Sequence, residues 1–130
     1  MKIIITGACG HIGSFLIDNL SKIKKVKKAI LIDSMKTNKY NSIFKLTKKP
    51  NFSFYQKDIS IKNSLLDFKN VDIIIHCASM TDAANSFGNE KLMYKNNLGC
   101  MNTVLDYCIK NKTKLIHIST TSVYGKQANL

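Results

Sequence analysis

The sequence contains the segment Thr6-Gly7-Ala8-Cys9-Gly10-His11-Ile12-Gly13, which joins an apolar segment, residues 2–6, to one with helical periodicity. Gly7 permits a sharp turn out of the apolar segment, and Gly10 lets the backbone approach a pyrophosphate without an intervening Cβ. Gly13 lets the following helix pack closely on the strand. The start of that helix offers unpaired N–H groups and the positive end of the helix dipole to phosphates. We predict a dinucleotide-binding turn here, with a glycine turn that binds no ligand as the alternative.

Apolar, strand-like segments alternate with helical ones along the rest of the chain. This alternation favours βαβ units and a parallel sheet, and strands that are apolar throughout indicate a sheet covered on both faces. Right-handed crossovers then favour the strand order 3-2-1-4-5. We therefore predict one α/β domain over residues 1–130, a Rossmann-type doubly wound parallel sheet that stops after its fifth strand. The expected strands are residues 2–6, 29–33, 52–56, 71–76 and 114–119, and the main helices are residues 12–23 and 90–111.

Apolar residues at helical spacing predict which face of each helix packs on the sheet. In the first helix this face comprises Ile12, Phe15, Leu16, Leu20 and Ile23. In the second helix it comprises Leu98, Met101, Leu105, Cys108 and Ile109. The five lysines between residues 22 and 28 are expected to close the first helix, where cations complement its dipole.

The composition is that of a folded chain with an unusual charge. Of the 130 residues, 45% are hydrophobic, which excludes a disordered chain, and no apolar stretch approaches the ~20 residues of a membrane span. All twenty basic residues are lysines and the formal net charge is +12, so a nucleic-acid binder is one alternative. We expect solvated surface lysines and neither a nucleic acid nor a membrane as partner, because direct base readout relies on arginine.

The start of the chain and its cysteines indicate the compartment. Met1-Lys2 leads directly into the first strand-like segment, so we expect no signal peptide. The four cysteines form no C-x-x-C pair and show no spacing typical of zinc, so we expect no metal site. Reduced thiols in the cytoplasm are therefore the expectation.

Asp33 is the second feature that indicates a dinucleotide. It ends the second predicted strand, twenty residues after Gly13. A carboxylate there can accept both ribose hydroxyls of adenosine and would repel a 2′-phosphate, which favours NAD over NADP. Lys36 could partly accommodate that phosphate. The alternative is an ordinary turn residue after a strand.

The spacing Gly7-x-x-Gly10-x-x-Gly13 resembles that of extended short-chain dehydrogenases/reductases. Within them the chain is similar to the NAD-dependent sugar-nucleotide epimerase/dehydratase group. Further segments resemble this family in the correct order along all 130 residues. They are Asp58-Ile59, Ile75-His76-Cys77-Ala78-Ser79, Asn96-Asn97-Leu98-Gly99-Cys100-Met101-Asn102 and Ile118-Ser119-Thr120-Thr121-Ser122-Val123-Tyr124-Gly125.

The resemblance implies roles for these residues. Asp58 and Ile59 would contact adenine, and the segment ending in Ser79 would line the cofactor. Thr120 would be the active-site hydroxyl that binds the reacting substrate oxygen, although Ser119 or Thr121 could take its place. The implied NAD site comprises Gly7, Gly10, His11, Ile12, Gly13, Asp33, Asp58, Ile59, Cys77, Ala78, Ser79 and Asn96.

Structural alternatives exist for several of these residues. Asp58 can cap a following helix, and Cys77 can be a small core residue. His76, at a strand end, is expected to be a satisfied structural histidine. Asn96 is expected to tie two backbone segments together, and Gly99 to admit a neighbouring backbone.

The family's acid/base pair, Tyr-x-x-x-Lys, is missing, because no tyrosine of the chain is followed four residues later by a lysine. We therefore expect the amino-terminal part of a longer nucleotide-sugar enzyme, arising from truncation, a split gene or proteolysis, that binds NAD but is inactive alone. A non-catalytic NAD-sensing module is the alternative. The outer edge of the fifth strand would be unpaired, which predicts an oligomer or a missing partner.

Overall fold

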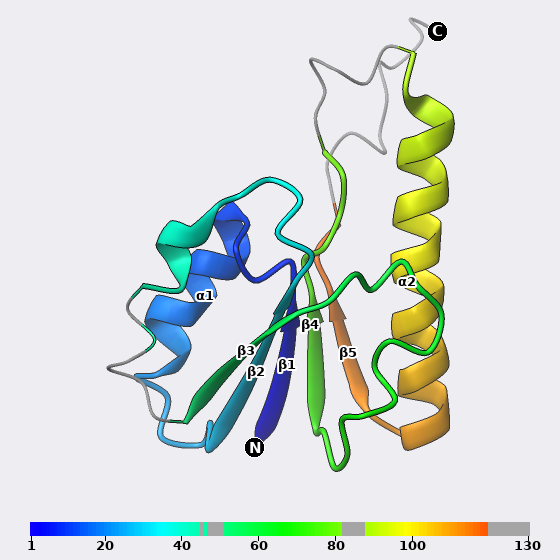
Figure 1. The fold of residues 1–130 in the computed structure, drawn as a ribbon. Coiled ribbons are helices and arrows are strands. Elements are labelled where there is room, and N and C mark those ends of the chain that lie inside the picture. The colour runs from blue at the N-terminus through cyan, green and yellow to red at the C-terminus, as the bar shows by residue number, and fades with distance from the viewer. Residues whose placement is uncertain (45, 47–50, 82–87, 120–130) are drawn as a thin grey trace, which may run out of the picture.

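The computed structural model describes residues 1–44, 46, 51–81 and 88–119, which form a five-stranded parallel sheet with helices on both faces (Figure 1). The strand order is β3-β2-β1-β4-β5, as predicted from the sequence. The chain reverses its direction of winding between β1 and β4, which are neighbours in the sheet. The strands are β1 (Lys2–Thr6), β2 (Lys28–Asp33), β3 (Phe52–Gln56), β4 (Ile73–His76) and β5 (Lys114–His117).

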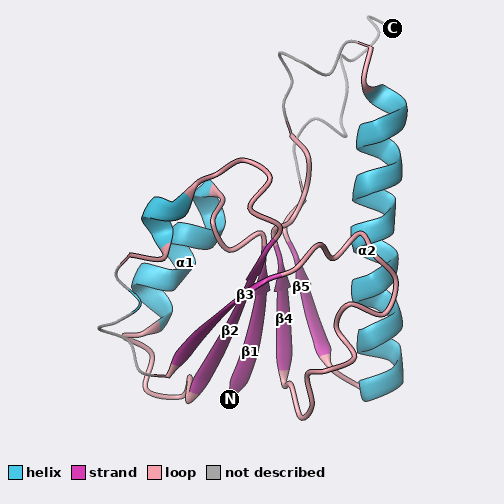
Figure 2. Cartoon of the chain, in the orientation of Figure 1, coloured by secondary structure: helices cyan, strands magenta, loops and turns pink. Residues whose placement is uncertain are grey.

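The helices lie on opposite sides of this sheet (Figure 2). The helix α1 (His11–Leu20) connects β1 to β2, and the short 3-10 helix η1 (Tyr40–Ser42) follows β2. The long helix α2 (Glu90–Asn111) connects β4 to β5. The bounds of α2 are those predicted from the sequence. The doubly wound α/β prediction is therefore confirmed.

Neighbouring residues of the central strands pack into two different cores. In β1, Ile3 and Ile5 belong to the core under α1, whereas Ile4 belongs to the core under α2. All three side chains are at most 2% exposed. Because each face is covered by a helix, the three central positions of the strand are all apolar, which explains the absence of polar alternation there.

The predicted face of α1 was correct at Leu20 and wrong at Ile12, Phe15 and Ile23, while Leu16 is half-buried against the core under this helix. Ile12 and Phe15 are 47% and 66% exposed, and the buried residues are Gly13, Ile17 and Leu20. The helix also ends at Leu20, so the lysines from 22 to 28 do not close it. The apolar periodicity gave no signal at the small Gly13, whose close contact with the turn after β1 orients the helix so that Ile17 and Leu20 are buried while Ile12 and Phe15 are exposed.

The predicted inner face of α2 was wrong for most of its members. The helix buries Cys100, Thr103, Val104, Tyr107 and Cys108, of which only Cys108 was expected. Leu98, Leu105 and Ile109 are 43%, 38% and 78% exposed. The helix thus carries two apolar stripes, and the sequence periodicity identified the outer one.

No helix in the described part of the chain is long and apolar enough to cross a membrane. The strand β5 ends at His117, two residues earlier than predicted, and it lies at one edge of the sheet. Its Ile116 side chain is 47% exposed, so the sheet is less well covered at this edge than at its centre.

Two substitutions on α2 test which face is buried. Val104→Ala removes two methyl groups from a fully buried position and should lower the free energy of unfolding by about 2 kcal/mol. Ile109→Ala removes more carbon atoms from a position that is 78% exposed and should cost under about 0.5 kcal/mol. Urea denaturation at low chain concentration measures both. The reverse order of effects would mean that α2 packs by the face predicted from the sequence.

Candidate functional site

The glycine turn after β1 is held by backbone contacts that leave no space for a side chain. Gly7 has a φ of +66°, and a Cβ on it would lie 2.7 Å from the backbone of Ala78. A Cβ on Gly13 would lie 2.3 Å from the carbonyl oxygen of Gly7. The turn therefore fixes the start of α1 against the end of β1 and brings residues 77–78, at the end of β4, beside it.

The first turn of α1 is open at its N-terminal end. Gly10 is the residue before the helix, and no side chain caps the helix there. The Ser14 N–H donates to the Gly10 carbonyl at 2.9 Å, so the N–H groups before Ser14 have no partner within the helix. His11 and Ile12 are exposed at this end. These N–H groups and the helix dipole form an arrangement that favours an anion.

Asp33, at the end of β2, lies at the mouth of this turn. Its Oδ2 accepts a hydrogen bond from the Cys9 backbone N–H at 2.9 Å. Its Oδ1 accepts one from the Met35 backbone N–H at 2.9 Å. These two bonds orient the carboxylate and leave further lone pairs on both oxygens. The sequence placed Asp33 beside the glycine turn, and the structure brings the two together.

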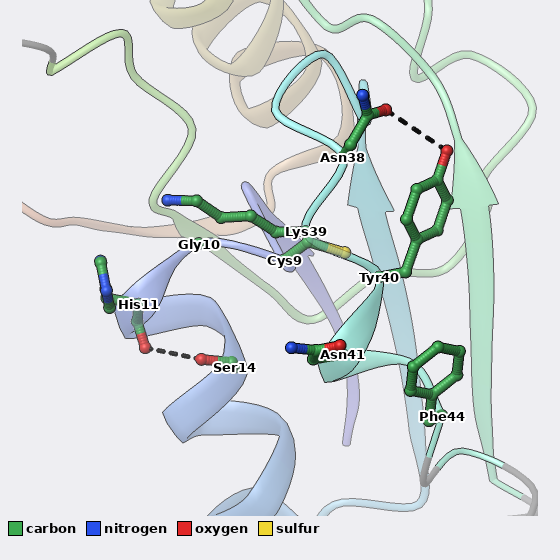
Figure 3. A pocket seen from close by; sticks show the side chains of 9 residues that line it. All are labelled: Cys9, Gly10, His11, Ser14, Asn38, Lys39, Tyr40, Asn41 and Phe44. Carbon is green, nitrogen blue, oxygen red and sulfur yellow. Dashed lines mark hydrogen bonds between the residues drawn. The ribbon is translucent and has the colours of Figure 1, made fainter.

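A cavity of about 470 Å³ opens between the start of α1 and the segment that follows β2 (Figure 3). This volume lies within the range of small-molecule sites. The residues from α1 are His11 and Ser14, and the opposite wall carries Lys39 and the aromatic rings of Tyr40 and Phe44. The remaining lining residues are Cys9, Gly10, Asn38 and Asn41. The glycine turn is therefore accessible to a ligand.

Asp58, after β3, accepts hydrogen bonds at both of its carboxylate oxygens. Its Oδ2 accepts from the Lys36 ammonium at 2.7 Å, and its Oδ1 accepts from the backbone N–H and the hydroxyl of Ser60. Burial by itself would raise the pKa of Asp58, but the bonds from Lys36 and Ser60 outweigh it and lower that pKa below its usual range. Asp58 thus caps a turn and not a helix, because no helix follows it in residues 58–68. Ile59 is 4% exposed and belongs to the core under α2.

The end of β4 contributes small residues beside the turn. The Cys77 N–H donates to the Thr6 carbonyl at 3.1 Å, and the Ala78 N–H donates to the Thr6 hydroxyl at 3.4 Å. Cys77 is half-buried against the core under α1, while Ser79 is exposed. Because their side chains are small, the backbone of these residues is accessible from the space beyond the end of β1.

His76 is a satisfied structural histidine, as expected. Its Nδ1 lies 2.7 Å from the Thr6 hydroxyl, and its ring stacks on that of His117 with 5.5 Å between centroids. Because the Thr6 oxygen accepts from Ala78, its proton can be donated to Nδ1, which requires a neutral ring. Burial, with a smaller contribution from His117, lowers the pKa of His76 to about 4.

Within the described residues, the amide that fastens α2 to the segment after β4 is that of Asn97, whereas Asn96 was expected to tie two backbone segments together. The Met80 backbone donates to Asn97 Oδ1 at 2.8 Å, and Asn97 Nδ2 donates to the Met80 carbonyl at 3.1 Å. Among the described residues, Asn96 donates to two side chains, Asn97 Oδ1 and Cys100 Sγ. The sequence shows two adjacent asparagines, whose side chains point ~100° apart around a helix. The structure was needed to tell which of the two faces the segment after β4. Gly99 admits the Ser60 backbone as predicted, since a Cβ there would lie 3.0 Å from the Ser60 carbonyl oxygen.

Two further expectations are limited by the part of the chain that is described. Thr120, the predicted active-site hydroxyl, and Thr121 lie outside the described residues. Within the described residues, no cluster of three or more metal-ligating side chains is found. The four cysteines are free thiols, and burial raises the pKa of each, led by Cys9 and Cys100 at about 11.

Almost the whole chain matches one known protein family. A family model described as the NAD dependent epimerase/dehydratase family matches residues 3–130. The chain is 34% identical over 129 residues to a dTDP-D-glucose 4,6-dehydratase of Dictyostelium discoideum, covering 95% of this chain and 30% of that protein. It is 31% identical to a UDP-glucose 4-epimerase of Yersinia enterocolitica, covering 97% and 39% of the two proteins. The chain therefore spans only about a third of the length of these curated relatives.

A solved structure gives the same result. The UDP-glucuronic acid 4-epimerase of Bacillus cereus, in complex with NAD, superimposes with a TM-score of 0.82 and 31% identity. The match covers 99% of this chain and 43% of that chain.

The pKa of His76 predicts a specific loss of stability in acid. The unfolded histidine takes up a proton as the pH falls through 6.5, whereas the folded one does so only near 4, so folding is progressively destabilised between these values. Denaturation at pH 7 and pH 5 should differ by about 2 kcal/mol on account of His76. This difference should shrink in His76→Asn and persist in the control His11→Asn, whose histidine is exposed. Equal pH dependence in both variants would contradict the assignment.

Proposed function

The chain belongs to the NAD-dependent epimerase/dehydratase family, and we propose that it is the NAD-binding domain of a nucleotide-sugar enzyme of this family. One observation carries the proposal: the Asp33 carboxylate is fixed at the mouth of the glycine turn by the Cys9 N–H at 2.9 Å. A diphosphate and an adenosine ribose lie next to each other in NAD. A helix N-terminus and a carboxylate lie next to each other in this chain, which matches that order of groups.

The other groups of NAD follow from this placement. The diphosphate lies against Gly10, His11 and Ile12 at the start of α1, and the adenosine ribose donates its hydroxyls to Asp33. Adenine lies toward the end of β3, where Asp58 offers an acceptor for the amino group and Ile59 supports the loop from the core. Gly7 and Gly13 would shape the turn through their close backbone contacts, and Cys77, Ala78, Ser79 and Asn96 would line the rest of the cofactor.

The reaction we propose for the whole protein is reversible hydride transfer at a carbinol carbon of a nucleotide sugar. The nicotinamide supplies the hydride acceptor and donor when NAD is bound. Thr120 orients the substrate hydroxyl. The acid/base pair is not carried by these 130 residues, since none of the five tyrosines has a lysine four residues later. The chain alone therefore binds cofactor without turning over substrate.

A second candidate is a module that senses the redox state of NAD without catalysis. The two functions differ in one measurement. A catalytic domain gains activity on UDP- or dTDP-glucose when a carboxy-terminal portion of a relative is supplied, and a sensor does not. We place the protein in the cytoplasm, which its four free thiols support. We treat its lysines as surface charge, with neither nucleic acid nor membrane as partner.

We also propose that a second copy of the chain covers the outer stripe of α2. Tyr94, Leu98, Leu105 and Ile109 are 70%, 43%, 38% and 78% exposed. Their spacing of four, seven and four residues places them on one helix face. An apolar stripe of this length on an exposed helix is typical of a helix–helix interface.

NAD binding is tested by thermal unfolding. Adding NAD at a hundredfold excess over its dissociation constant should stabilise the chain by ~2.7 kcal/mol, which raises the melting temperature by several degrees. Asp33→Asn should weaken NAD at least about tenfold, because it replaces a charged acceptor of the ribose hydroxyls. The control Asp106→Asn removes the same charge from the exposed side of α2 and should leave affinity unchanged. No shift with wild-type chain, in the absence of bound nucleotide, would contradict the proposal.

Self-association is tested by light scattering coupled to size exclusion. The wild-type chain should elute as an oligomer, and Ile109→Lys should dissociate it, because a charge placed in an apolar interface is costly. Leu92→Lys places the same charge at a position that is 56% exposed on another face of α2 and should have no effect. A monomeric wild-type chain would refute this interface.

A further inference from the structure

Two oppositely charged side chains follow β2, and they are held on opposite sides of its end. The Asp33 carboxylate accepts from the Cys9 N–H, in the turn after β1. The Lys36 ammonium lies 2.7 Å from Asp58 Oδ2, in the loop after β3. Since β2 lies between β3 and β1 in the sheet, the cation and the ribose-facing anion are drawn apart.

Asp58 is the fixed member of the ion pair with Lys36. Its second oxygen accepts from the Ser60 N–H at 2.9 Å and from the Ser60 hydroxyl at 2.7 Å. Ser60 in turn packs on α2 at Gly99, where a Cβ would lie 3.0 Å from its carbonyl oxygen. The Asp58 side chain is 24% exposed, whereas that of Lys36 is 62% exposed. The lysine is therefore positioned by the carboxylate, and not the reverse.

The position of Lys36 matters for one chemical group, a phosphate on the 2′-oxygen of the adenosine ribose. Such a phosphate would face the Asp33 carboxylate and be repelled by it. A lysine released from Asp58 would be a flexible point charge only three residues from Asp33, able to offset that repulsion. While Asp58 holds the ammonium on the β3 side, no such compensation is available from Lys36.

We propose that Asp58 sets the selectivity between NAD and NADP. It holds the Lys36 ammonium on the β3 side, so that the negative charge of Asp33 at the ribose is not compensated and the 2′-phosphate of NADP is repelled. This inference rests on the proposed NAD site. It assigns selectivity to a residue that touches neither the ribose nor its phosphate. The selectivity of Asp33 then depends on a second carboxylate, one strand away.

The test is the ratio of the dissociation constants of NADP and NAD, measured by calorimetry. Asp58→Asn removes the negative charge that holds Lys36. It keeps an acceptor oxygen for adenine, and adenine is common to both cofactors. The ratio should fall at least about fivefold, equivalent to roughly 1 kcal/mol. The double variant Asp58→Asn with Lys36→Met should restore the ratio, because the effect requires the freed ammonium.

The single variant Lys36→Met provides a second, independent test. Lys36 is exposed, so we expect the variant to fold. It should change the ratio by less than about twofold, since the ammonium is already withdrawn from the ribose. It should also raise the pKa of Asp58, which carbon-detected NMR of the carboxyl reports. An unchanged pKa would mean that the pair is not formed and would overturn the inference.

The remaining outcomes separate this inference from the proposed function. If wild-type chain binds no NAD, both are overturned. If NAD binds but the ratio is unchanged in Asp58→Asn, or falls equally in the double variant, the selectivity role is overturned while the NAD site stands. A rise in NAD preference caused by Lys36→Met alone would also overturn it, because Lys36 would then already serve the phosphate.

Discussion

The contact between Gly13 and the carbonyl oxygen of Gly7 is the constraint on which the site depends. A Cβ at Gly13 would lie 2.3 Å from that oxygen, far inside van der Waals contact, and backbone on both sides cannot yield as a flexible side chain would. The first turn of α1 therefore sits directly on the end of β1. Any residue larger than glycine would push the helix away and move its N–H groups out of the crevice.

The same constraint organises the ends of three strands. The Ala8 N–H donates to the Ile32 carbonyl at 3.1 Å, and the Cys77 N–H donates to the Thr6 carbonyl at the same distance. The first bond ties the turn after β1 to the end of β2, and the second ties the segment after β4 to the end of β1. They do so where the order of strands reverses, because α1 leaves toward one face of the sheet and α2 covers the other. Crevices at such reversal points are where open α/β sheets bind ligands.

Features encoded by short stretches of sequence were predicted well, and features set by packing were not. The strand order and the bounds of α2 follow from apolar segments and their connections, which are local signals. The prediction of the buried face of α2 failed because the helix has two apolar stripes, and the buried one contains Cys100 and Thr103, which hydropathy does not single out. Asp33 was placed correctly because a strand end and a glycine turn meet in any such sheet.

The ion pair between Lys36 and Asp58 was beyond the reach of sequence patterns. The residues lie 22 positions apart, on loops whose relative position is known only once β2 and β3 are paired. Lys36 was considered only as a partner for a phosphate near Asp33. Because charge attraction has no preferred direction, a flexible lysine pairs with a nearby carboxylate that is itself held in place. For Lys36 that carboxylate is Asp58.

The site therefore combines a rigid part and an adjustable part. Its rigid part is made of backbone N–H groups and of Asp33, whose two oxygens are each fixed by an N–H at 2.9 Å. Its adjustable part is the side chain of Lys36, which is 62% exposed and held by one ion pair. Groups that are fixed before a ligand arrives cost little entropy on binding, whereas redirecting a long exposed side chain from its ion pair costs only about 1 kcal/mol. In the proposed NAD site, recognition of the diphosphate and ribose would be built into the fold, and the choice between related cofactors would be left to a charge that a single substitution can move.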